Sequence, residues 1–178
     1  MTHVISETNI SLLVWAKACN YHFQVIRHVR CLLTHDVAET LTCSLVNNRL
    51  GYCNSLVYGA LVSSINKLQR VLNNAAHVVA QSSQCTDARS LLESLHWLPV
   101  QQRITFKLAL VTFKTLRTSP PSYLNAHLIS AVPSRSLRSS CQPLLQVPAC
   151  TTTFPRRAFS FATLHLWNSL PADILTCT

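Results

Sequence analysis

Apolar residues recur every three to four positions along most of residues 10–129, which is the spacing of α-helices that bury one face. The clearest example begins at Ser63 or Ser64. Its apolar stripe is about 100° wide, and polar residues fill the other side. The pattern predicts an amphipathic helix that packs on a core through Ile65, Leu68, Leu72, Ala75, Ala76 and Val79.

Further helices are expected on the amino-terminal side of this stretch. Residues 1–9 are polar and predict a disordered start, whereas residues 10–33 predict one helix or two short ones. Thr34 is suited to cap the next helix, with Asp36 in its first turn against the positive end of the helix dipole. Gly51 is expected to interrupt that helix.

The longest expected helix covers about residues 99–117, with Pro99 at its first position, where a missing N–H costs nothing. A short helix capped by Thr86 precedes it. Four basic side chains of the long helix fall within about 80° of one another on a helical wheel. Leu110 interrupts this strip, and the other positions are mainly apolar. The pattern predicts a largely buried helix with a narrow basic strip formed by Arg103, Lys107, Lys114 and Arg117.

The pattern changes after residue 129. Residues 130–155 are rich in Ser, Thr and Pro and predict an extended or disordered connector with room for one strand. Residues 156–178 predict a C-terminal helix and a tail. A total of 2 glycines disfavours a meander of tight hairpins. We therefore expect a mainly α fold, with a helical block at 10–129, a Ser/Pro-rich extended connector and a C-terminal helix.

Composition adds information about partners. Hydrophobic residues make up 48% of the chain and charged residues 12%, against about 25% charged residues in ordinary soluble domains. Exposed apolar surface that contacts a protein partner is therefore expected. The net charge of +9 favours an anionic partner, and nucleic acid is the first candidate.

The cysteines and the apolar segments bear on the compartment. None of the 8 cysteines forms a C-x-x-C pair, and their apolar helical surroundings favour buried free thiols over disulfides. The sequence shows no signal peptide and no segment long and apolar enough for a bilayer. We expect an intracellular protein without a membrane partner, and the choice between nucleus and cytoplasm stays open.

Several strings follow the order found in LINE-class, non-LTR retrotransposon polyproteins. RLGYCNSLVYG at 49–59 resembles the family signature R-L-D-Y-C-N-x-L-x-Y-G, and SSINKLQRVLNNAAHVV at 63–79 resembles the helix that comes after it. SLHWLPVQQRITFKLALVTFKTL at 94–116 resembles L-H-W-L-P-V-x-x-R-I-x-F-K. PPSYLNAHL, PSRSLRSS and AFSFATLHLWNSLP continue the order. Over about residues 10–175 the chain resembles the thumb and C-terminal region that lies after the palm of the family's reverse transcriptase.

Four positions depart from the family pattern. Gly51 stands where the family usually has Asp, Leu72 where it has Gln, and His77 where it has Arg. Arg156 replaces a residue that is often Gly or Asp. These changes remove polar or acidic groups and indicate relaxed constraint.

Polymerase chemistry needs carboxylates that hold two metal ions. The family supplies them from its palm, whereas this chain has 6 acidic residues and no Asp-Asp pair. Cys31 with His28 or His35, and Cys141 with Cys150, lack zinc-finger spacing. Too few glycines are present for a phosphate-binding loop. We expect no catalytic residue, no metal, no cofactor and no small-molecule substrate.

The resemblance implies that cations of this region bind the phosphates of a template–primer duplex, so the expected nucleic-acid partner is RNA or an RNA–DNA duplex. Trp97, Trp167 and Phe159 are expected to be core anchors and not stacking platforms. The sequence thus predicts a non-catalytic fragment with at most weak, sequence-independent nucleic-acid binding. Two alternatives remain, a helical protein-interaction module and a transposon relic without selected function. The expected phosphate contacts are Lys67, Arg70, Arg103, Lys107, Lys114 and Arg117, unless these cations only solubilise exposed faces.

Overall fold

The computed structural model describes the backbone of residues 2–83, 85–118, 122–131, 144–149 and 158–176, and the side chains of these residues except 2–13, 15, 47–57 and 176. Its helices are α1 (Thr2–Val29), the 3-10 helix η1 (Arg30–Leu32), α2 (His35–Val57), α3 (Val62–Val79), α4 (Ala88–Ser94), α5 (Val100–Thr118), α6 (Ser122–Asn125), α7 (Phe159–Asn168) and α8 (Ala172–Thr176). Within these ranges the extended structure is one isolated bridge between Ser130 and Leu145. The mainly α prediction is confirmed.

The chain divides into two compact units, Met1–Arg103 and Ile104–Thr178. The division falls within α5, directly after its first turn. The predicted boundaries at residues 129 and 155 follow composition, whereas this division follows packing.

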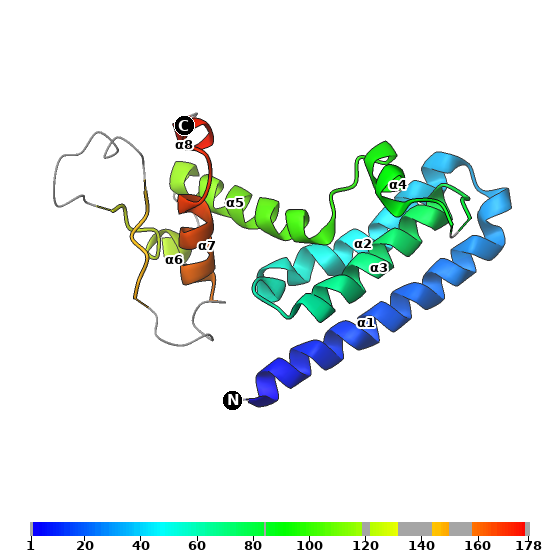
Figure 1. The fold of residues 1–178 in the computed structure, drawn as a ribbon, viewed down its shortest axis with the longest axis horizontal. Helices are drawn as coiled ribbons and strands as arrows, with labels where there is room; N and C mark the ends of the chain where they lie inside the picture. The colour runs from blue at the N-terminus through cyan, green and yellow to red at the C-terminus, as the bar shows by residue number, and fades with distance from the viewer. Residues whose placement is uncertain (1, 84, 119–121, 132–143, 150–157, 177–178) are drawn as a thin grey trace. The chain divides into compact units, whose positions relative to one another are not determined.

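Helix α3 is the centre of the first unit and packs against α1, α2 and α4 (Figure 1). The predicted apolar stripe is buried except for the half-buried Ile65, and Leu68, Leu72 and Ala75 are almost completely inaccessible. The buried face is wider than the stripe, because helices cover more than one side of α3 and also bury Val71 and His77. Burial of this face is the main apolar contribution to the unit's stability.

The corner between α1 and α2 is fixed by a buried arginine. Arg30 is 7% exposed. Its Nε and Nη2 donate to the carbonyl oxygen of Val79 at 3.2 and 2.7 Å, and its Nη1 donates to that of Leu33 at 2.9 Å. Gln81 Nε2 in turn donates to the Arg30 carbonyl at 3.2 Å. The guanidinium therefore satisfies a carbonyl at the negative end of the α3 dipole.

Two helices are longer than predicted. Helix α1 begins at Thr2, where we expected a disordered start over residues 1–9, and α2 passes through Gly51, which we expected to interrupt it. Both differences have the same physical cause. Extending an existing helix is far easier than starting one, and a single interior glycine costs only about 1 kcal/mol.

The helix starts show which capping predictions hold. Thr34 is the N-cap of α2, with Asp36 in the first turn, but its side chain makes no capping hydrogen bond. Asp87, and not Thr86, caps α4 by accepting from the Arg89 backbone N–H at 3.1 Å. Helix α3 begins slightly early, because the Leu61 carbonyl accepts from the backbone N–H groups of residues 64 and 65.

The first turn of α5 has a long-range cap. Helix α5 begins at Val100, directly after Pro99, and the Pro99 carbonyl accepts from the Arg103 N–H at 2.9 Å. The Val100 N–H donates to Gln69 Oε1 on α3 at 2.9 Å. A residue outside the helix thus fixes where α5 begins in the first unit.

The second unit has its own apolar cluster, which includes part of the predicted connector. Asn168, at the end of α7, accepts from the Leu145 N–H at 2.9 Å and donates to the Leu145 carbonyl at 2.8 Å. Residues 144–149 are therefore held against α7, while residues 132–143 and 150–157 lie outside the described ranges. Helix α8 adds a short element where only a tail was predicted. The cluster consists of Leu128, Leu145, Leu164, Trp167 and Leu175.

Candidate nucleic-acid interface

Lys67 and Arg70 lie one turn apart on α3 and are both exposed. Their positions are on the side of the helix away from the buried residues Leu68 and Leu72. Within the described residues, neither side chain has a hydrogen-bond or ion-pair partner. Two adjacent cations with free donors can contact phosphate oxygens of a nucleic-acid backbone.

Arg103 differs from the other predicted contacts because it is half-buried. Its Nε donates to the Leu98 carbonyl at 2.7 Å. Burial lowers the pKa of its guanidinium from the usual range, and the nearby Cys43 thiolate form opposes that shift. The side chain already takes part in the packing of the first unit, so it has fewer donors left for a phosphate than an exposed arginine.

The remaining predicted contacts lie in the part of α5 that belongs to the second unit. Lys107, Lys114 and Arg117 are exposed, and they span about 15 Å of the helix at 1.5 Å per residue. The Arg117 guanidinium lies 5.6 Å from the centroid of the Phe113 ring, which is a cation–π distance. Leu110, half-buried, lies between the cations as the sequence indicated.

The exposed face of α5 is more apolar than predicted. Phe106 is 58% exposed, Phe113 38% and Leu116 37%. Phe106 and Phe113 are seven residues apart and therefore lie on one face, with the three cations beside them. We expected the apolar positions of this helix to be largely buried. The seven-residue spacing of the two rings was visible in the sequence, but spacing alone does not tell which apolar face is covered.

The tryptophans are placed as core residues. Trp97 is 8% exposed and Trp167 3% exposed, whereas Phe159 is half-buried. Burial on this scale leaves neither indole face open for stacking on a base. The exposed aromatic rings of α5 are thus better placed for such contacts than the tryptophans.

Acidic residues near helix starts have structural roles. Asp36 and Asp173 lie in first turns, and Asp87 is an N-cap. Within the described residues, no three His, Cys, Asp or Glu side chains gather in a way that could hold a metal ion. Cys141 and Cys150 lie outside the described ranges.

The cysteines are only partly as expected. All four whose side chains are described are free thiols, but only Cys19 is buried, while Cys31 and Cys85 are exposed. Cys43 is half-buried beside Glu39 and Arg103. Burial, followed by the Glu39 charge, raises the pKa of the Cys43 thiol, and Arg103 partly offsets the rise. A raised pKa lowers the thiolate fraction and makes this cysteine a poor nucleophile.

Comparisons with protein-family models, curated proteins and solved structures give no match. Among the described residues, no helix combines the length and the hydropathy that crossing a membrane requires.

Proposed function

We propose that this chain derives from the thumb and C-terminal region of a LINE-class reverse transcriptase and binds RNA–DNA duplexes through phosphates, without catalysis. The observation that carries the proposal is that five of the six predicted contacts are exposed cations on helices. The net charge of +9 and the ordered motifs in the sequence support it. The contacts are Lys67 and Arg70 on α3, and Lys107, Lys114 and Arg117 on α5.

Such contacts are electrostatic and do not read sequence. Lysine and arginine side chains displace condensed counterions from the phosphates, so affinity falls log-linearly with salt, with a slope of about −0.7 to −0.9 per neutralised phosphate. The three exposed cations of α5 would therefore account for a slope of about −2 to −3. The proposed binding is weak at physiological salt.

The test uses chain 1–178 and a labelled RNA–DNA duplex, titrated by fluorescence anisotropy at several salt concentrations. Replacing Lys107, Lys114 and Arg117 by Gln should weaken binding and reduce the salt slope by about 2 to 3. The control replaces Lys17 and Arg89, two exposed cations outside the predicted set, so losses are compared per charge removed. Equal losses per charge removed in both variants would mean that only net charge matters and would contradict a defined interface.

A second function, binding of a protein partner, is favoured by the exposed phenyl rings Phe106 and Phe113 on α5. Contacts of this kind depend on apolar burial and persist at high salt. Saturable binding to another protein that survives about 1 M salt and is lost when both rings become Gln would favour this function over the phosphate contacts.

A further inference from the structure

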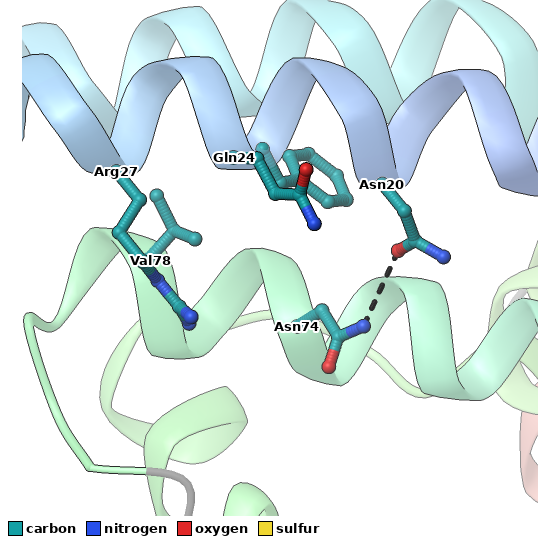
Figure 2. A pocket seen from close by; sticks show the side chains of 6 residues that line it. Asn20, Gln24, Arg27, Asn74 and Val78 are labelled. Carbon is teal, nitrogen blue, oxygen red and sulfur yellow. Dashed lines mark hydrogen bonds between the residues drawn. The ribbon is translucent and has the colours of Figure 1, made fainter.

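A pocket of about 250 Å³ lies between α1 and α3 in the first unit (Figure 2). The described residues that line it are Asn20, Phe23, Gln24, Arg27, Asn74 and Val78. None of the six predicted phosphate contacts is among them, so a ligand of this pocket is independent of the proposed function.

Helical spacing brings the polar lining residues together. Asn20, Gln24 and Arg27 are four and three residues apart on α1 and therefore share one face. Asn74 Nδ2 on α3 donates to Asn20 Oδ1 at 3.2 Å, which joins the two helices at one end of the pocket. Phe23 lies at the helix interface and is 3% exposed. The pocket thus combines polar walls with an apolar base.

The charge of the pocket is positive. Arg27 carries the only formal charge among the described lining residues, and no carboxylate is among them. Within the described part of the chain, neither Arg27 nor Gln24 has a hydrogen-bond or ion-pair partner. In Figure 2 the Arg27 side chain extends from α1 toward Val78 on α3. A guanidinium with unused donors and no acid among the described lining residues suits a phosphate, which it can bind with two parallel hydrogen bonds.

The other lining residues limit the classes of ligand that the pocket can bind. Carboxamides both donate and accept, so Asn20, Gln24 and Asn74 suit a ligand that carries N–H or O–H groups as well as an anion. Phe23 and Val78, each 3% exposed, close the base of the pocket, so a ligand meets mainly the polar side chains. The volume of about 250 Å³ is slightly below the roughly 300 Å³ at which sites for drug-sized ligands begin. The pocket is therefore matched to one nucleotide and not to a chain of several.

We propose that this pocket binds a single nucleoside monophosphate group, with the phosphate on Arg27 and Gln24 and the polar edge of the nucleoside on Asn20 and Asn74. The ligand is bound and not transformed, since no nucleophile or acid is among the described residues that line the site. The phosphate can belong to a free nucleotide or to the 5′ end of an oligonucleotide.

Calorimetric titration of chain 1–178 with AMP, adenosine and inorganic phosphate tests the proposal. AMP should bind more tightly than either part alone. The variant Arg27→Gln should weaken AMP binding by about tenfold or more, since a charge-assisted contact is lost. Gln24→Glu, which places a carboxylate one turn from Arg27, should weaken it similarly while supporting the helix. Lys17→Gln makes the same charge change on the same helix outside the pocket and should have no effect.

Two oligonucleotides distinguish the sources of the phosphate. If the pocket binds the 5′ ends of oligonucleotides, a single-stranded RNA hexamer with a 5′-phosphate should compete with AMP. The same hexamer with a 5′-hydroxyl should not compete. Failure of both to compete while AMP binds would assign the pocket to free nucleotides. Equal affinity for AMP and inorganic phosphate, equal effects of Arg27→Gln and Lys17→Gln, or no AMP binding by the folded chain would each overturn the proposal. Duplex binding by the Arg27→Gln variant reports on the proposed function separately.

Discussion

At the scale of single residues, Arg30 is the polar group whose loss should matter most for folding. It is buried, and its Nε, Nη1 and Nη2 all donate to backbone carbonyls, two of them to that of Val79. Arg30→Met keeps the length of the side chain but leaves those carbonyls without the guanidinium. We expect the free energy of unfolding to fall by about 2–3 kcal/mol.

Urea unfolding followed by circular dichroism measures that loss. Arg27→Met is the matched control, because Arg27 is exposed on the preceding turn and should change stability by less than about 0.5 kcal/mol. Equal stability of the two variants would show that the Arg30 contacts contribute nothing net.

Replacement of Thr42 should change the stability of the fold in the opposite direction. It is completely buried, and its Oγ1 has no hydrogen-bond partner in the described structure. Thr42→Val replaces the unsatisfied hydroxyl with a methyl group of similar size, so stability should rise by about 1 kcal/mol. Thr112→Val is the control: the Thr112 hydroxyl is equally buried but donates to the Leu108 carbonyl at 2.8 Å. A larger gain in the control than in Thr42→Val would contradict the assignment.

The Cys43 thiol should make the free energy of unfolding depend on pH in the alkaline range. Burial raises the pKa of its thiol above the usual 9.0, so the folded chain holds this proton more firmly than the unfolded chain. Its contribution to stability is fully present below pH 9 and is lost as the pH rises through the raised value. Cys43→Ala should therefore show a smaller fall in unfolding free energy above pH 9 than the parent chain. Parallel pH profiles of the two chains would count against this coupling.

At the scale of elements, the continuity of α2 gives a direct test. If the helix passes through Gly51, Gly51→Ala should stabilise the chain by about 0.5–1 kcal/mol, because alanine loses less backbone entropy in a helix. Thermal unfolding gives the comparison. In a chain whose helix ended at residue 51, the substitution would instead lower stability or leave it unchanged.

Helical spacing in the sequence predicts which segments are helices, but it does not predict the residues at which each helix begins and ends. Leu68, Leu72 and Ala75 recur with the period of α3 and are buried in it. The first residue of α5 depends on Gln69, 31 positions away, and no local pattern contains such a contact. The exposure of Phe106 could not be predicted for the same reason, because the sequence of a helix does not show whether another element covers its apolar residues.

At the scale of the whole molecule, the division within α5 could not be predicted from composition. The Ser/Pro-rich change after residue 129 suggested the boundary, but Asn168 holds residues 144–149 within the second unit. The exposure of most of the predicted cations could be anticipated, because lysine and arginine are almost always exposed. Arg103 is the exception, since its packing beside Cys43 depends on a different helix.

At the same scale, the cooperativity of unfolding tests whether the first unit is a stably folded domain or a relic without a defined fold. A core of interlocked helices predicts a single cooperative transition for that unit, seen alike by circular dichroism and by fluorescence of the buried Trp97 in a variant with Trp15 and Trp167 replaced by Phe. A gradual loss of signal without a shared midpoint would favour a relic over both binding functions.

The arginine corner has a consequence for how the molecule opens. Because Arg30, directly after α1, donates two hydrogen bonds to the carbonyl of Val79 at the end of α3, the two helix ends should fray together. Backbone amides of the last turn of α3, and those of η1, should therefore exchange with solvent deuterium at one common rate, as members of a single opening unit. The amides of η1 and of the last turn of α3, which are far apart in sequence, would then share one exchange lifetime that depends on the Arg30 side chain.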